Sequence, residues 1–127
     1  MNYILDTHTL IWFKEGDVFL STNAKTAIED ERNTKYVSTA SLWEIAIKIS
    51  LGKLLLKKPL EEFLDNLSQT NINILPLKFS HFLRISKLEF IHKDPFDRII
   101  ICQSLEENLR IIGKDPNFPA YGVNLFW

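Results

Sequence analysis

Four carboxylates are candidates for metal chemistry, because each follows an apolar segment or lies near an expected helix start: Asp6, Glu44, Asp97 and Asp115. Carboxylates that converge in a fold raise each other's pKa unless a cation intervenes. Such a cluster predicts a hard divalent cation with oxygen ligands, Mg²⁺ or Mn²⁺. A bound ion of this kind lowers the pKa of a coordinated water and neutralises charge on a phosphate, which is the chemistry of phosphodiester hydrolysis.

Two of these acids also have an ordinary structural interpretation. Asp6 comes directly after an apolar segment and can cap the next helix, because its carboxylate accepts hydrogen bonds from free backbone N–H groups. Ser41 and Glu44 form the pattern of a capping box, in which each side chain satisfies the other's backbone N–H. Lys48 follows Glu44 at i+4, a spacing that favours a surface ion pair. Taken alone, neither acid separates a structural role from a ligand.

The later acids are open to the same two interpretations. Asp94 is expected to cap a helix that has Pro95 at its first position and Asp97 in its first turn. Asp97 also precedes the apolar run 99–101, so it is held at the edge of the core, where a ligand can be fixed. Asp115 stands before Pro116 in the pattern of a turn. The coincidence of four acids at strand exits and helix starts is what favours a metal site.

Other metal and nucleophile chemistry is not indicated. Cys102 lies in an apolar run and is the only cysteine, so we expect core packing and no intramolecular disulfide. The chain has no cysteine pair and no histidines at HExxH spacing, which argues against zinc. His8, His81 and His92 are interpreted as surface or satisfied core residues. No glycine-rich phosphate loop is present.

Length and charge set further bounds. A chain of 127 residues, 46% of them hydrophobic, fits one compact domain over residues 1–127. Fifteen Lys and Arg against sixteen Asp and Glu argue against holding nucleic acid by bulk charge, although a metal cluster would supply local positive charge. No apolar run approaches the roughly 20 residues of a membrane span, and residues 1–6 lack the basic start of a signal peptide. We therefore expect a cytoplasmic protein with no membrane association.

Apolar periodicity predicts strands that alternate with helices. The expected strands cover residues 3–5, 35–39, 72–75, 110–112 and 123–127, and the expected helices cover 10–16, 22–31, 42–52, 60–67, 79–86 and 95–109. Because parallel strands need crossover connections, this alternation predicts an α/β domain with a mainly parallel sheet covered by helices on both faces. Such sheets bind ligands beyond the carboxyl ends of their strands, where the acids are placed.

Five segments carry a resemblance to a known family: residues 4–8 (ILDTH), 41–48 (SLWEIAIK), 92–98 (HKDPFDR), 115–118 (DPNF) and 121–123 (YGV). In order and spacing they resemble PIN-domain proteins and, more closely, the VapC-type toxins of type II toxin–antitoxin pairs. The resemblance spans nearly the whole chain. It implies a PIN-like three-layer α/β/α sandwich, a homodimer, and a cognate antitoxin whose C-terminal segment covers the acidic groove.

The resemblance also implies roles for individual residues. Asp6, Glu44, Asp97 and Asp115 match the acidic metal-binding positions of the family, and Asp94 would be an outer helper. In one departure, Gly113 stands two residues before Asp115, where many relatives have Thr or Ser. Asp115 is therefore the least secure of the ligands.

The function implied is a metal-dependent endoribonuclease. Asp6, Glu44 and Asp97 would anchor one or two Mg²⁺ or Mn²⁺ ions, and Asp115 would complete the coordination or orient the attacking water. Thr7 would add a hydroxyl near the metal, and Lys48 or Arg98 would meet the substrate phosphates. Three alternatives stay open: a non-catalytic module whose acidic groove receives a basic partner segment, a DNA-directed nuclease, and a housekeeping nuclease.

Overall fold

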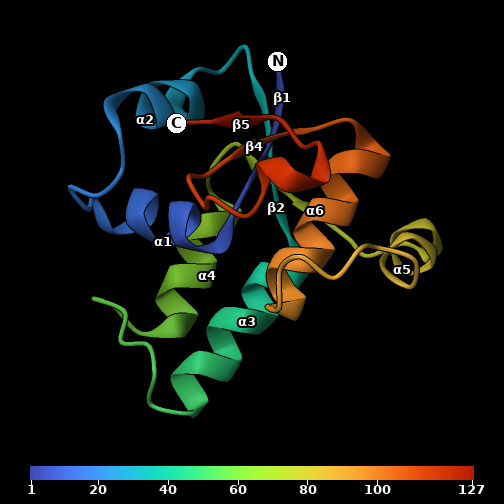
Figure 1. The fold of residues 1–127 in the computed structure, drawn as a ribbon. Coiled ribbons are helices and arrows are strands. Elements are labelled where there is room, and N and C mark those ends of the chain that lie inside the picture. The colour runs from blue at the N-terminus through green and yellow to red at the C-terminus, as the bar shows by residue number, and fades with distance from the viewer.

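A five-stranded sheet forms the centre of the molecule in the computed structural model, which describes residues 1–127. The strands are β1 (Asn2–Leu5), β2 (Thr34–Ser38), β3 (Ile72–Leu75), β4 (Arg110–Ile112) and β5 (Leu125–Phe126). They lie in the order β3-β2-β1-β4-β5, and every neighbouring pair is parallel (Figure 1). The predicted α/β fold with a mainly parallel sheet is therefore confirmed.

Six helices connect and cover the strands. They are α1 (Thr7–Glu15), α2 (Thr22–Glu29), α3 (Thr39–Ser50), α4 (Leu60–Ser68), α5 (Phe79–Ile85) and α6 (Pro95–Glu107), and a short 3-10 turn, η1, covers Pro119–Tyr121. None of these helices has the length and apolar character that crossing a membrane requires.

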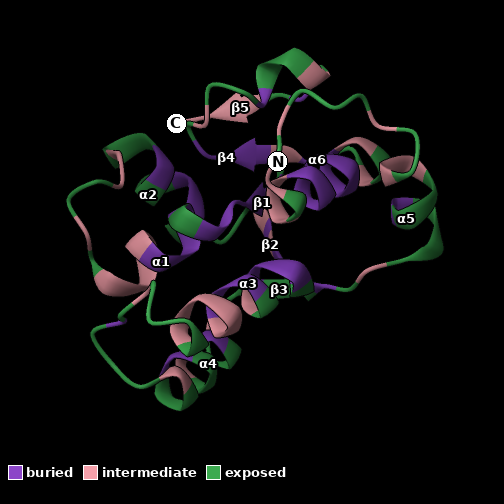
Figure 2. Cartoon of the chain, turned by 60° about the horizontal axis from the view of Figure 1, so that its bottom comes forward, coloured by how far each residue is buried: buried purple, intermediate pink, exposed green.

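Two hydrophobic cores, one on each face of the sheet, define the three layers. Tyr3 and Leu5 of β1 contribute to one core together with side chains of α1, α2, α3 and α4. Ile4 points to the opposite face and packs with Ile100 and Ile101 of α6. This alternation follows from the two-residue period of a strand. Figure 2 shows buried residues in β1, β2 and β4 and in the middle of α6, whereas α4 and α5 keep exposed outer faces.

Several element boundaries differ from those expected. Helix α3 begins at Thr39 rather than near 42, because the Ser38 hydroxyl accepts the backbone N–H of Ala40 and caps it. Helix α6 ends at Glu107, since Asn108 takes the left-handed conformation (φ 53°). Helix α2 ends at Glu29 instead of residue 31, and the last strand contains only Leu125 and Phe126. Cys102 is buried against α3, as expected for core packing.

The carboxyl edge of the sheet positions the acidic residues. Strand β1 pairs with β2 on one side and with β4 on the other, so the chain order reverses at β1. Only Asp6 separates β1 from α1, and α3 follows β2 directly. Open parallel sheets bind ligands at such a switch point. Asp6 at the end of β1 and Asp115 after β4 therefore lie on the two sides of the expected binding crevice.

Candidate metal centre

Asp6 is both a helix cap and a candidate ligand. Its Oδ1 accepts the backbone N–H of Thr9 (2.8 Å), while its own N–H donates to the carbonyl of Ile112 in the β4 strand (3.2 Å). Oδ2 has no hydrogen-bond donor from the protein, and the residue lines a cavity of about 340 Å³. Burial raises the pKa of Asp6, and the nearby Asp115 adds to this increase. The two roles are therefore compatible, because each uses a different oxygen.

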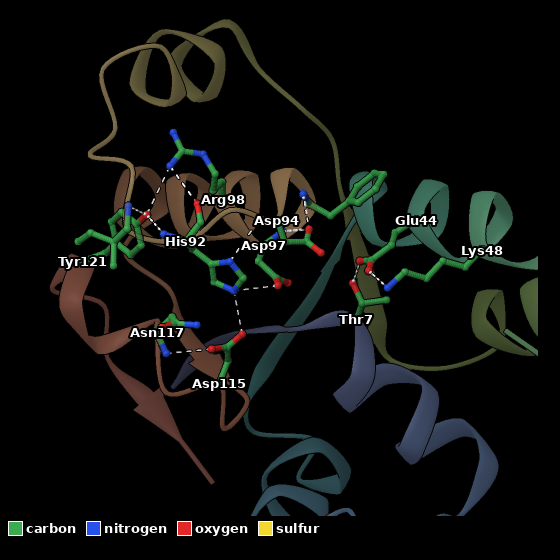
Figure 3. Close-up of polar contacts among 12 residues, drawn as sticks. Thr7, Glu44, Lys48, His92, Asp94, Asp97, Arg98, Asp115, Asn117 and Tyr121 are labelled. Carbon is green, nitrogen blue, oxygen red and sulfur yellow. Dashed lines mark hydrogen bonds and ion pairs between the residues drawn. The ribbon is translucent and has the colours of Figure 1, made fainter. Parts of the chain in front are cut away.

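Asp97 and Asp115 meet at His92. Nε2 of His92 lies 3.1 Å from Oδ2 of Asp97 and 2.9 Å from Oδ2 of Asp115 (Figure 3). The other oxygen of Asp115 accepts the backbone N–H of Asn117 (2.8 Å), so the expected turn is present as well. One ligand atom from each of the three side chains falls within a span of 4.8 Å. Sequence reasoning did not select His92, although it lies only two residues before the helix cap Asp94.

The hydrogen bonds of His92 indicate how it acts. The backbone N–H of Asp94 donates to its Nδ1 (3.2 Å), so in the neutral ring the proton lies on Nε2, the atom that points at the two carboxylates. A metal-ligating histidine normally donates from its other ring nitrogen to an acceptor. Here that nitrogen accepts instead. His92 is therefore arranged to hold Asp97 and Asp115 rather than to bind an ion itself.

Asp97 has a strongly raised pKa. Burial, followed by the charges of Asp94 and Glu44, raises its pKa from 3.8 to about 7, while His92 opposes the rise. Asp94 caps α6 through Oδ1, which accepts the N–H groups of Phe96 (2.8 Å) and Asp97 (3.2 Å). The expected helix start is therefore confirmed. Several carboxylates share a restricted space at this edge of the sheet, and each makes ionisation of Asp97 more costly.

Glu44 is buried and fully partnered, which corrects the expected capping box. Because α3 starts at Thr39, the Ser41 hydroxyl lies inside the helix, 2.9 Å from Oγ1 of Thr7. Glu44 is only 2% exposed; Oε1 accepts from Thr7 (2.7 Å) and Oε2 from Lys48 (2.6 Å). The i,i+4 pair with Lys48 therefore forms, but not as an ordinary surface pair. Figure 3 shows the Thr7, Glu44 and Lys48 group beside the His92 group.

Arg98 stabilises the loop before α6. Its guanidinium donates to the carbonyls of Leu88 (3.3 Å), Glu89 (3.0 Å) and His92 (3.4 Å). Its side chain also lies 3.4 Å from the Tyr121 hydroxyl, which accepts the backbone N–H groups of residues 91 and 92. Arg98 is 8% exposed. The sequence suggested that Arg98 contacts a substrate phosphate. In the structure its guanidinium instead donates to backbone carbonyls.

The structure brings three predicted acids to one cavity. Asp6, Asp97 and Asp115 line it together. Glu44 and Asp94 lie near enough to raise the pKa of Asp97, but they do not line the cavity. The donors are carboxylate oxygens, one of which, Oδ2 of Asp6, has no protein donor. This donor set fits a hard divalent cation such as Mg²⁺ or Mn²⁺.

Comparison with known proteins identifies the family. A model of the PIN domain matches residues 3–124, so the chain belongs to the PIN domain family. The resemblance to PIN-domain proteins is thereby confirmed. Comparison with curated protein sequences gives no match.

Solved structures share the same fold. VapBC2 from Rickettsia felis, bound to a DNA fragment from its promoter, has a TM-score of 0.74 at 16% identity, covering 99% of this chain and 98% of that chain. FitAcB from Neisseria gonorrhoeae has a TM-score of 0.70 at 17% identity, covering 100% of this chain and 97% of that chain. VapBC-1 from nontypeable Haemophilus influenzae has a TM-score of 0.69 at 17% identity, covering 99% of this chain and 97% of that chain. At these identities the likeness is one of fold, and it confirms the α/β/α sandwich.

Proposed function

We propose that this PIN-domain chain is a metal-dependent endoribonuclease that hydrolyses RNA phosphodiester bonds. The observation that carries the proposal is the shared cavity of Asp6, Asp97 and Asp115, which come from three distant segments of the chain. His92 is the one base that pairs with Asp97 and Asp115, and Asp6 pairs with none, so the acids outnumber the bases that partner them. Such an arrangement is costly without a cation, and it is the donor set that a phosphodiester-cleaving metal site requires.

The residues divide the work of the site. Asp6, Asp97 and Asp115 would hold Mg²⁺ or Mn²⁺, with Glu44 beside them. When bound, the ion supplies an activated water and neutralises charge on the phosphate. The Nε2 proton of His92 donates to Asp115, and the same nitrogen lies 3.1 Å from Asp97, so His92 would keep both carboxylates in position. Asp94 fixes the first turn of α6, on which Asp97 lies.

Glu44 has its own support in the structure. Its two oxygens are held by the hydroxyl of Thr7 and the ammonium of Lys48. We infer that Thr7 orients Glu44 and that Lys48 balances its charge. In this role Lys48 would meet a substrate phosphate only after releasing Glu44.

The test is RNA cleavage by the purified chain in Mn²⁺, Mg²⁺ or EDTA, with single-stranded DNA as a second substrate. Asp6→Asn should remove cleavage, and Asp65→Asn, which changes an exposed acid on α4, should leave it intact. Equal RNA cleavage by wild type and Asp6→Asn would refute the metal assignment. Preference for DNA would identify the DNA-directed alternative.

Calorimetry separates a nuclease from a docking module. The proposed site should bind Mn²⁺, and Asp6→Asn should abolish that binding without lowering the melting temperature. A module that only receives a basic segment needs no ion at Asp6. Mn²⁺ binding that is unchanged in Asp6→Asn would favour the module over the nuclease.

We further propose that the chain is the toxin of a type II pair, acting in the cytoplasm as a single PIN domain over residues 1–127. The structural likeness to VapBC proteins supports a cognate antitoxin. We propose in addition that the antitoxin covers the acidic groove and that the chain forms a homodimer. Light scattering would measure the number of copies. Expression of the wild-type chain should inhibit growth, and expression of Asp6→Asn should not. Co-expression of the protein encoded by a small adjacent open reading frame should relieve the inhibition.

A further inference from the structure

The cavity beside the carboxylates has a second wall of different chemistry. His8, Trp12, Lys114 and Pro116 line it together with Asp6, Asp97 and Asp115. His8 and Trp12 are four residues apart on α1, so they lie on the same side of the helix. Their ring centroids are 5.7 Å apart at an interplanar angle of 37°. Because α1 begins directly after Asp6, this aromatic pair is positioned by the same turn as the first acid.

Lys114 brings positive charge to this wall. Its Nζ lies 5.2 Å from the ring centroid of Trp12, 5.4 Å from that of Trp127 and 5.9 Å from that of Phe19. Although its neighbour in the chain is Asp115, it forms none of the ion pairs in the structure. The ammonium is therefore held over aromatic rings beside the cavity and is free to meet an anion.

We propose that His8, Trp12 and Lys114 form a nucleotide subsite, in which an unpaired base stacks on the two rings and the adjacent phosphate meets Lys114. The inference rests on the proposed function, because it places one nucleotide of the RNA beside the metal-holding acids. The cavity volume of about 340 Å³ falls in the range of about 300–1,000 Å³ found for small-ligand sites.

Stacking also defines the class of RNA. Every base has a π-face, so aromatic platforms bind single strands with little sequence preference. A base within a duplex is already stacked and paired, and it cannot enter such a wall without leaving its helix. The subsite therefore selects single-stranded or looped RNA, and it holds that strand next to the scissile bond.

The test measures binding rather than cleavage, so that it stands apart from the proposed reaction. The probe is a fluorescein-labelled single-stranded RNA pentanucleotide, titrated in EDTA with Asp97→Asn protein, in which one acid is neutralised and cleavage is prevented. His8→Ala and Lys114→Ala are added to this background. Both side chains are exposed, so neither change should disturb folding. Lys87→Ala, on the segment after α5, removes the same charge outside this cavity.

Each variant has its own expected result. His8→Ala should weaken binding about fivefold or more and leave its salt dependence unchanged, because it removes stacking alone. Lys114→Ala should weaken binding and lower the slope of log K against log salt by about 0.7, the value for one phosphate contact on a single strand. Lys87→Ala should change neither quantity.

Two results would overturn the inference. One is an unchanged affinity for the single-stranded RNA in both His8→Ala and Lys114→Ala. That result would favour a protein partner as the ligand of these residues. The other is that the substitutions weaken binding to duplex RNA of the same sequence as much as they weaken binding to the single strand. That result would exclude stacking of an unpaired base. Neither result contradicts the nuclease proposal, because that proposal is tested by RNA cleavage in the wild type and in Asp6→Asn. Conversely, failure of cleavage in the wild type would not alter this binding measurement.

Discussion

A Cβ atom placed on Gly113 would lie only 2.6 Å from Oδ2 and 3.0 Å from Cγ of Asp6. The residue after β4 must therefore be glycine if the acid after β1 is to keep its position. Asp6 therefore occupies space that a side chain at position 113 would otherwise fill. The glycine, a departure from the pattern that the resemblance implies, is thus linked to the placement of the candidate ligand Asp6.

Gly113→Ala should displace the Asp6 carboxylate and weaken Mn²⁺ binding. We expect a loss of about tenfold or more, the effect of disturbing groups that orient metal ligands. Isothermal calorimetry measures it. Asp6→Asn, which should abolish binding, gives the largest loss that displacement of Asp6 can cause. Unchanged affinity in the single variant would show that Asp6 does not contribute an essential ligand.

Asp97 should make the metal-free protein less stable as pH rises. Its pKa is about 7 in the folded chain, mainly through burial, against 3.8 ordinarily. Between these values the folded state binds the extra proton, so the free energy of unfolding falls from pH 4 to pH 7 and then levels. The loss is at most about 4 kcal/mol. Denaturant unfolding in EDTA should show Asp97→Asn to be more stable than wild type at pH 8. Equal stabilities there would contradict the raised pKa.

His92→Ala should raise the pH at which Mn²⁺ binds. The ion requires ionised Asp97, so affinity should increase through pH 7 in the wild type. His92 favours ionised Asp97, and its removal leaves Asp97 and Asp115 to repel each other. Calorimetry at several pH values should place the midpoint of the variant higher. A midpoint that does not move would mean that His92 has no influence on the acids it contacts.

Lys48→Met should destabilise the metal-free chain by about 1–2 kcal/mol, because buried Glu44 then keeps only Thr7 as a donor. Added Mn²⁺ should recover part of this loss by supplying charge near Glu44. Lys25→Met is the matched control, since Lys25 and Glu29 form an exposed i,i+4 pair at 4.0 Å. That pair should contribute no more than about 0.5 kcal/mol. Equal effects of the two changes in thermal unfolding would rule out a special role for Lys48.

Arg98→Ala should lower stability by about 2–3 kcal/mol without changing the salt dependence of RNA binding. The guanidinium donates to several carbonyls of residues 88–92, and no other side chain replaces those bonds. Arg32→Ala, which alters an exposed arginine, should leave the melting temperature unchanged. A smaller salt dependence of RNA binding in Arg98→Ala would instead support the phosphate contact that the sequence suggested.

Local chemistry explains which features could be predicted. The start of α6 followed from Asp94 and Pro95 alone, because capping involves neighbours in the chain. The start of α3 was misplaced, since both Ser38 and Ser41 can cap and the length of β2 decides between them. The role of His92 depends on contact with Asp115 after β4. No spacing along the chain indicates such a contact, and the commitment of Arg98 to a distant loop is hidden for the same reason.

The pairing of β1 with β4 also sets the time at which the site can form. Thr9 donates to the carbonyl of Ile112, 103 positions later, and Asp6 is fixed by the same strand. A chain emerging from the ribosome carries Asp6 and Glu44 long before it carries β4, whereas Asp97 emerges only shortly before that strand. Contacts this distant form late in folding. Translation products that end before Asp115 should therefore lack the proposed metal site and any activity that depends on it.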